Sequence, residues 1–339
     1  MKRFLALLLT LTLLLCVTAC GNNADTNTNP NQPAAGQNPS GDSDTDQDSS
    51  GAFPFTLTTK DGAEVTFTHV PERVLVTNVN PGDQLMALGL GDKIIGTGWN
   101  NTEVAEAFRA EYEAKPVVFE TSPSLETILD LEPDFVYGRS SSFTEKLGTT
   151  HDTLSNYGIS SLSNIESYKL GADLEDVYQD FYNLGRIFQV EDRAEELVNT
   201  MKERIAQVQD AIQGTEPVKV FVYDKERDGG AYTCGNNFTA TLIEYGGGEN
   251  IFKDMEETWQ VVSWEEVVDR NPDVIVINDY GDIPLEQKIS ELMDNPIMST
   301  VTAVQENNII SISLCESFAS SQTADTIEKF AQAFHPDCF

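Results

Sequence analysis

Two segments far apart in the chain share one sequence pattern, and this repeat constrains the fold more than any other feature. Segments 124–137 and 263–276 both read Ser-x-Glu-x-apolar-apolar-Asp-x-x-Pro-Asp and then continue as an apolar run. Each predicts a short helix that begins at a serine cap, stops before a proline and leads into a buried strand. The repeat therefore predicts two similar α/β lobes, and such proteins tend to work in the crevice between their lobes.

The first 52 residues predict an exported protein that is anchored to a membrane. Residues 1–19 are interpreted as a secretion signal, because Lys2 and Arg3 precede an apolar stretch too short to span a bilayer comfortably. Residues 17–20 resemble the lipobox of bacterial lipoproteins, which predicts that Cys20 carries the lipid; the alternative is an ordinary signal with an incidental cysteine. Residues 20–52 are polar, lack Lys and Arg, and predict a flexible, lipidated linker.

The charge of the chain argues against one class of partner. The sequence has 55 acidic and 21 basic side chains, a formal net charge of −34. Loss of the signal would remove two bases and no acid, so the mature chain would be more acidic still. This argues against binding of nucleic acid and against a basic patch for anionic lipid.

Three cysteines remain outside the signal and the predicted lipid site: Cys234, Cys315 and Cys338. Because the number is odd, at least one is unpaired; one disulfide is possible, and the sequence does not say which.

Helix-like and strand-like segments alternate along the rest of the chain, which predicts a mostly parallel sheet. The expected fold class is α/β, with an N-terminal lobe at 53–189 and a C-terminal lobe at 214–339. Residues 190–213 carry the longest amphipathic pattern and predict one long helix that joins the lobes. Segment 228–238, rich in Gly, Asn and aromatic residues, is expected to be a loop.

Patterns typical of catalysis are missing from the sequence. There is no nucleophile elbow, P-loop or dinucleotide fingerprint. The histidines, His69, His151 and His335, are scattered and are interpreted as surface or capping residues. We therefore expect no enzymatic activity, no metal site and no cofactor of the protein's own.

Ligands of open α/β sheets lie beyond the carboxyl ends of the strands, where this chain places aromatic and polar side chains. Such side chains suit a large, partly aromatic solute. Arg139 directly follows a predicted buried strand, and its guanidinium suits carboxylate or phenolate-type oxygens; the alternative is that it pairs with one of the many acids. The predicted ligand-binding residues are Trp99, Arg139, Ser140, Tyr223, Tyr232, Asn236 and Tyr280.

Glu126 and Glu265 occupy equivalent places in the two repeats. Each follows a predicted serine cap by two residues, where an acid favours the helix dipole. The alternative is that each lobe presents one carboxylate to a symmetric partner, which would guide its orientation and association rate.

Further motifs give the chain a family resemblance. These are Pro71-Glu72-Arg73-Val74, the segment 88–96, the two repeats, the segment 246–252 and His335-Pro336. Together they resemble the substrate-binding lipoproteins of ABC importers for ferric siderophores, haem and cobalamin. The resemblance implies two Rossmann-like lobes joined by a long helix, the helical-backbone periplasmic-binding-protein fold, with limited closure. It also implies that Glu126 and Glu265 dock onto arginines of a permease dimer.

The function expected from this resemblance is solute capture. A monomer, lipid-anchored to the outer face of the cell membrane, would bind an iron complex and deliver it to an ABC permease dimer with its ATPase. A ferric siderophore is the first expectation, because of Arg139 and the aromatic residues, and haem or a corrinoid such as cobalamin is the alternative. An exported enzyme or a sensor using the same cleft is the more remote one.

Overall fold

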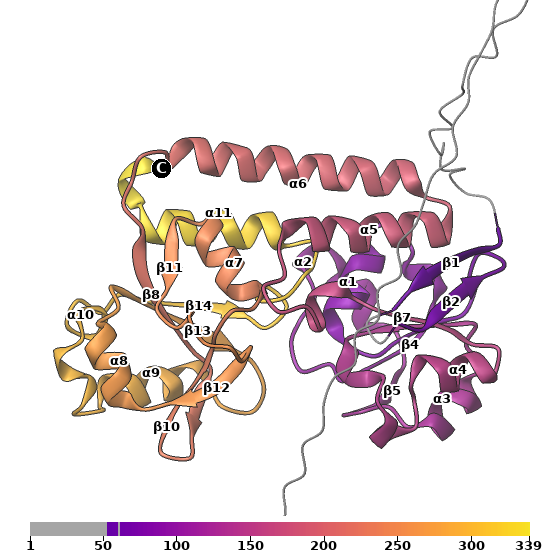
Figure 1. The fold of residues 1–339 in the computed structure, drawn as a ribbon, viewed down its shortest axis with the longest axis horizontal. Coiled ribbons are helices and arrows are strands. Elements are labelled where there is room, and N and C mark those ends of the chain that lie inside the picture. The colour runs from indigo at the N-terminus through magenta and orange to yellow at the C-terminus, as the bar shows by residue number, and fades with distance from the viewer. Residues whose placement is uncertain (1–52, 60–61) are drawn as a thin grey trace, which may run out of the picture. The chain divides into compact units, whose positions relative to one another are not determined.

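The computed structural model describes residues 53–59 and 62–339, and all of these belong to one compact unit, 49–339. The predicted signal and linker, including Cys20, lie outside the described residues. The described part is α/β with two parallel sheets (Figure 1), as the sequence predicts. We call the elements from β1 to α5 the first lobe and those from β8 to α11 the second lobe.

The first lobe is built on a five-stranded sheet of order β5-β4-β3-β6-β7, in which every neighbouring pair is parallel. Its strands are β3 (Val74–Val76), β4 (Ile94–Gly98), β5 (Val117–Phe119), β6 (Phe135–Gly138) and β7 (Ser160–Ser163). A hairpin of β1 (Phe55–Thr58) and β2 (Glu64–Phe67) precedes them. The helices are α1 (Val79–Ala87), α2 (Glu106–Glu113), α3 (Leu125–Leu131), α4 (His151–Asn156) and α5 (Leu174–Phe188).

The second lobe is built on a four-stranded parallel sheet of order β11-β8-β13-β14. Its strands are β8 (Val218–Tyr223), β11 (Gly248–Asn250), β13 (Val274–Asp279) and β14 (Ile309–Ser313). The helices are α7 (Phe238–Tyr245), α8 (Trp264–Arg270), α9 (Leu285–Met293), α10 (Thr302–Gln305) and α11 (Thr323–Phe334).

A small antiparallel sheet in the second lobe corrects one prediction. Segment 228–238 is not all loop, because it contains strand β10 (Gly230–Cys234), which pairs with β9 (Lys225–Arg227) and β12 (Trp259–Val262). Asp228 and Gly229, with φ of 54° and 81°, join β9 to β10. An Asp-Gly pair with two positive φ values is a strong hairpin signal, which the Gly-rich composition of this segment obscured.

The two repeats form equivalent structures. Ser124 and Ser263 cap α3 and α8, accepting hydrogen bonds from backbone N–H groups three residues on. Asp134 then accepts the backbone N–H of Arg73 at 2.9 Å, and Asp273 that of Lys219 at 3.1 Å. In each lobe, the aspartate at the end of the repeat motif therefore links the start of the strand that follows it, β6 or β13, to the neighbouring strand, β3 or β8.

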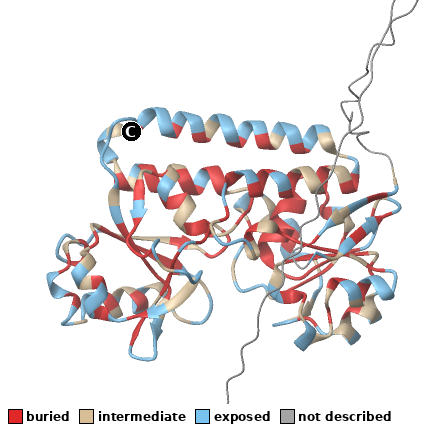
Figure 2. Ribbon diagram, in the orientation of Figure 1, coloured by how far each residue is buried: buried red, intermediate tan, exposed pale blue. Residues whose placement is uncertain are grey.

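Helix α6 (Glu191–Ala211) follows the first lobe in sequence and contacts α5 and α11 (Figure 1). Its buried positions recur at helical spacing: Ala194, Val198, Met201, Ile205 and Val208. They belong to one hydrophobic cluster that extends from β3 and β6 through α5 and α6 to β8, α7 and α11. Figure 2 shows the buried side of α6 facing the helices beneath it. The lobes therefore share a core on the α6 side, and close packing there opposes large relative motion.

The loop between β14 and α11 connects the second lobe to helix α1 of the first. Asn80 donates to the backbone oxygen of Ala319 at 3.2 Å, and the Asp83 carboxylate accepts the backbone N–H of Ser321 at 2.6 Å. Asp83 also accepts the N–H of Ala105 at 3.0 Å. Burial raises the pKa of Asp83 above its ordinary value, while these hydrogen bonds oppose the rise. The junction thus rests on directed hydrogen bonds as well as on the shared core.

Candidate ligand-binding site

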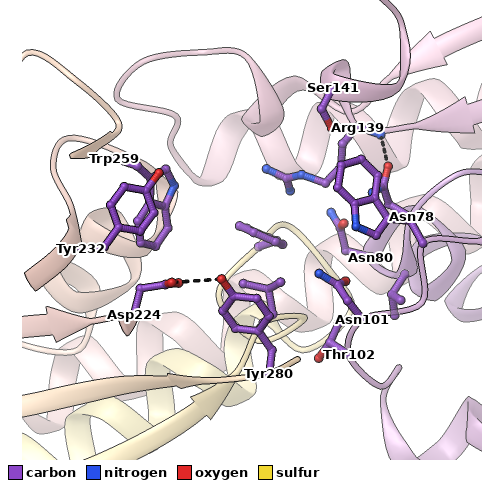
Figure 3. A pocket seen from close by; sticks show the side chains of 14 residues that line it. Asn78, Asn80, Asn101, Thr102, Arg139, Ser141, Asp224, Tyr232, Trp259 and Tyr280 are labelled. Carbon is purple, nitrogen blue, oxygen red and sulfur yellow. Dashed lines mark hydrogen bonds between the residues drawn. The ribbon is translucent and has the colours of Figure 1, made fainter. Parts of the chain in front are cut away.

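A cavity of about 230 Å³ lies where the carboxyl ends of the two sheets face each other (Figure 3). Six of its lining residues follow the end of a strand directly or by one residue, which is the position at which open α/β sheets bind ligands. The cavity is smaller than the roughly 300–1,000 Å³ of typical ligand sites. A large solute would therefore extend out of it or require the lobes to separate. The lining residues are Asn78, Val79, Asn80, Trp99, Asn101, Thr102, Arg139, Ser141, Asp224, Tyr232, Trp259, Tyr280, Leu314 and Phe318.

The wall from the first lobe presents amides and an indole. Asn78 stands at the N-cap position of α1, and its side-chain oxygen accepts the backbone N–H of Arg139 at 3.0 Å rather than one of the helix. Trp99 follows β4 with a φ of 53°, in the left-handed region that bulky residues rarely adopt. Such backbone strain is concentrated at functional sites, because only a surrounding structure that fixes the residue retains it.

Arg139 lines the cavity with its charge already compensated. Its guanidinium forms an ion pair with Glu166, whose side chain is only 3% exposed. Asn80 and Asn164 donate to the same carboxylate, the latter at 2.9 Å. The guanidinium carbon also lies 3.7 Å from the centroid of the Phe318 ring, which comes from the second lobe. Of the two alternatives left open by the sequence, pairing with an acid is the one that the structure contains.

The wall from the second lobe carries a pair of stacked aromatic rings. Tyr232 on β10 and Trp259 on β12 have ring centroids 5.7 Å apart and planes inclined by 28° (Figure 3). Trp259 is paired with Cys234, two residues from Tyr232, so both rings stand on the same face of the small sheet. This face offers a flat, partly polar surface to a ring-shaped solute.

A buried acid completes that wall. Asp224 is 2% exposed and accepts a hydrogen bond from the Tyr280 hydroxyl at 3.0 Å (Figure 3). Burial, and next the negative charge of Asp224, raise the pKa of Tyr280, so its phenol stays neutral at neutral pH. The buried ammonium of Lys288 lies 4.8 Å from the Tyr280 ring centroid and donates to the backbone oxygen of Asn278. Burial lowers the pKa of Lys288, and the nearby carboxylates of Asp224 and Asp279 oppose that effect.

Four of the seven predicted ligand residues come together in the cavity: Trp99, Arg139, Tyr232 and Tyr280. The other three lie elsewhere. Ser140 donates two hydrogen bonds to Ser167, while its neighbour Ser141 lines the cavity. Tyr223 is buried in the core of the second lobe and donates to Glu291. Asn236 lines a separate depression beside α7. The ligand roles of all seven residues stay predictions.

Sequence reasoning missed two aromatic residues and the acid. Asp224 directly follows β8, so the expectation that ligand residues lie just beyond strand ends could have identified it. Tyr223, which is the last residue of that strand, was predicted instead. Trp259 lies on a strand that the sequence did not predict, and Phe318 lies in the loop after β14. No periodic pattern marked either position.

The remaining polar candidates have structural surroundings. Glu126 and Glu265 are exposed in the first turns of α3 and α8, on the side of the lobes away from α6 (Figure 1).

The prediction that His151 is a surface or capping residue was wrong. Its side chain is buried and hydrogen-bonded to the hydroxyls of Ser161 and Ser163. Cys234, Cys315 and Cys338 are free thiols. Within residues 53–59 and 62–339, no group of three or more His, Cys, Asp and Glu is placed to hold a metal ion.

Two parallel sheets that share a cavity at their carboxyl ends define a two-lobed solute-binding protein. The chain belongs to the periplasmic binding protein family, which matches residues 74–313. Proteins of this family bind solutes and carry them as ligands rather than as cofactors. Substrate-binding proteins of ABC importers work with a permease and an ATPase.

Three similar proteins illustrate the relationship. A cobalamin-binding protein of Halobacterium salinarum is 26% identical over 84% of this chain and 75% of its own length. The ABC transporter substrate-binding lipoprotein YvrC of Bacillus subtilis, described as uncharacterised, is 25% identical over 85% of this chain and 87% of its own. The solved structure of an ABC-type Fe3+-hydroxamate transport system from Saccharomonospora viridis is 26% identical, and the match covers 84% of this chain and 100% of that one, with a TM-score of 0.71.

In the part of this chain that the structure describes, every helix is too short or too polar to cross a bilayer.

Proposed function

We propose that this protein is the lipid-anchored, monomeric solute-binding component of an ABC importer for a metal complex without net negative charge. A corrinoid of the cobalamin type is the first candidate. The protein performs no chemistry on its ligand; it holds the complex between the lobes and delivers it to the permease dimer with its ATPase.

The observation that carries this choice is the ion pair between Arg139 and Glu166. The expectation of a ferric siderophore rested on the aromatic residues and on Arg139 as an available cation. With Glu166 bound, the guanidinium has little charge left for a ligand, and the buried carboxylate of Asp224 also lines the cavity. Arg139 is the only base among the described residues that line this cavity, so a complex that buries several negative charges inside it, as haem would with its two propionates, is disfavoured.

The rest of the lining supports a neutral macrocycle that carries amides. The indoles of Trp99 and Trp259 and the phenol of Tyr232 offer flat surfaces. The side chain of Asn101 offers a donor and an acceptor, whereas that of Asn78 offers only its N–H donors, because its oxygen already accepts three hydrogen bonds. Corrinoids present a flat ring edged with carboxamides. The cobalamin-binding relative from Halobacterium salinarum supports the same choice.

A neutral ferric trihydroxamate is the second candidate, because three hydroxamate anions balance one Fe3+ and the charge argument applies to it equally. The 26% identity to the Fe3+-hydroxamate transport protein supports this alternative. It differs from a corrinoid in shape, since it is compact rather than flat, and would make less use of the paired rings of Tyr232 and Trp259.

A binding panel tests the proposal. Cyanocobalamin, a neutral ferric trihydroxamate, an anionic ferric tricatecholate and haem are titrated separately while tryptophan fluorescence and the free energy of unfolding are measured. At a hundredfold excess over its dissociation constant, the true ligand stabilises the folded protein by about 2.7 kcal/mol. We expect cyanocobalamin to do so and the two anionic complexes to have no effect; tighter binding of the tricatecholate would overturn the proposal.

A further inference from the structure

Two basic side chains stand beside the aromatic pair at the edge of the cavity. Lys225 on β9 is paired directly with Tyr232 on β10, and Arg227 lies two residues further along β9. Because side chains alternate across a strand, both bases share the face of Tyr232, whereas Glu226 points to the opposite face. The Lys225 ammonium lies 5.9 Å from the Tyr232 ring centroid, and the guanidinium carbon of Arg227 lies 5.1 Å from it. Both cations therefore lie within cation–π distance of an aromatic ring that lines the cavity.

These cations differ from Arg139 in their electrostatic surroundings. The Arg227 side chain is 54% exposed and lies 3.5 Å from Asp228, which is itself 80% exposed, so the pair is weak and screened by salt. The Lys225 ammonium is 3.6 Å from Asp224, an acid that already accepts the hydroxyl of Tyr280. Lys225 also lies 5.8 Å from the centroid of the Tyr280 ring, the second tyrosine of the cavity. The partner of Arg227 is exposed, unlike the buried Glu166 that pairs with Arg139. Lys225 lies beside the buried Asp224, but it shares that carboxylate with the Tyr280 hydroxyl.

We infer that Lys225 and Arg227 form a subsite for a single anionic group at the periphery of the ligand, a phosphodiester. This rests on the proposed function and extends it. The cavity proper takes a neutral ring, while the edge of the small sheet offers a guanidinium and an ammonium to one oxyanion, the pairing that such groups favour. Tyr232 lines the cavity and lies near both bases, so a ligand that stacks on its ring brings a peripheral group close to them.

The inference narrows the class of ligand. A complete corrinoid such as cobalamin has no net charge but carries one phosphodiester in the loop that links its nucleotide to the ring. Cobinamide has the same ring and amides and lacks that phosphodiester. A protein with a cationic edge next to a neutral cavity should therefore distinguish complete from incomplete corrinoids, although both fit the aromatic surface.

The test compares these two ligands on the full chain and on a double variant, Lys225→Gln with Arg227→Gln. Dissociation constants for cyanocobalamin and dicyanocobinamide are measured by tryptophan fluorescence at low and at high salt. We expect the double variant to bind cyanocobalamin about tenfold more weakly, as for two partly exposed charge contacts, and dicyanocobinamide with unchanged affinity. In the wild type, salt should weaken cyanocobalamin binding only.

A matched control removes the same charge elsewhere in the second lobe. Lys219→Gln with Lys253→Gln alters two exposed bases, Lys219 lying at the amino end of β8, away from the cavity. This control should leave both affinities unchanged. Equal losses for both ligands, or no loss for cyanocobalamin in the Lys225 and Arg227 variant, would overturn the subsite while leaving the proposed function intact. If the wild type bound neither corrinoid, both the subsite and the choice of a corrinoid as the ligand would be overturned.

Discussion

The guanidinium of Arg139 is bound by the carboxylate of Glu166, with 18% and 3% of the two side chains exposed. Removal of one partner from a buried pair leaves the other charge without compensation, which costs more than loss of the whole pair. We expect Arg139→Met to lower the free energy of unfolding by about 3 kcal/mol, and Arg139→Met with Glu166→Gln to lower it clearly less. Urea unfolding of the two single variants and the double variant measures this coupling. Strictly additive losses would contradict a role for Glu166 as the partner that neutralises Arg139.

Trp99 occupies the left-handed region with a φ of 53°. For a residue with a Cβ this conformation costs about 1–2 kcal/mol, which glycine avoids. Trp99→Gly should therefore stay within about 1 kcal/mol of the wild type in stability, because relief of strain offsets lost packing. Trp99→Ala, which keeps the strain, is the matched control and should be the less stable of the two. Both should bind cyanocobalamin about tenfold more weakly, as loss of one aromatic contact predicts; an unchanged affinity would remove Trp99 from the site.

Asp180 on α5 is 1% exposed and accepts the backbone N–H of Ile165 with both oxygens, at 3.0 and 3.1 Å. Burial raises its pKa well above the ordinary 3.8, helped by the charge of Glu166. The folded protein then holds this proton more tightly than the unfolded chain, so the contribution of Asp180 to stability falls as pH rises from about 3.8 through the raised pKa. Asp180→Asn should lack this loss: its stability relative to the wild type should increase from pH 4 to pH 7. A difference between the two proteins that is independent of pH would contradict this assignment.

Glu126 and Glu265 are exposed in equivalent first turns of α3 and α8. If they contact the permease, Glu126→Ala with Glu265→Ala should leave ligand affinity unchanged and reduce uptake by cells. The matched control is Asp130→Ala with Asp269→Ala, which removes one exposed acid from each of the same helices outside the first turn. If uptake were unchanged in the Glu126 and Glu265 variant, neither residue would be needed for docking, and both would serve only to stabilise their helices through the helix dipole.

The sequence predicted those parts of the fold that depend on periodicity and on local capping. The repeats at 124–137 and 263–276 form equivalent helix–strand units, because serine caps and left-handed residues at Glu132 and Asn271 set the helix boundaries locally. Helix α6 follows from its apolar stripe alone. The prediction of a loop at 228–238 was wrong for two reasons. The hairpin of β9 and β10 has a local signal in Asp228-Gly229 that the prediction did not use, whereas the pairing of β10 with β12 depends on contacts between segments distant in sequence.

The site was less accessible to sequence reasoning for a related reason. The ends of parallel strands are local features, so Trp99, Arg139 and Tyr280 could be placed at the cavity from sequence. The partner that determines what Arg139 can bind is Glu166, 27 residues away in sequence, and only the tertiary fold brings it near. A sequence can identify a basic residue as a candidate ligand-binding group. Whether its charge is already neutralised by an acid depends on the tertiary packing of the lobe.

The central claim is that one ligand is held by both lobes at once, and calorimetric titration of cyanocobalamin tests it most directly. The wild type is compared with Trp99→Ala from the first lobe, Trp259→Ala from the second lobe, and the double variant. We predict one ligand per chain in the wild type, a loss of about tenfold in affinity for each single variant, and a larger loss for the double variant. Unchanged affinity after either single substitution, or no heat of binding with the wild type, would contradict it.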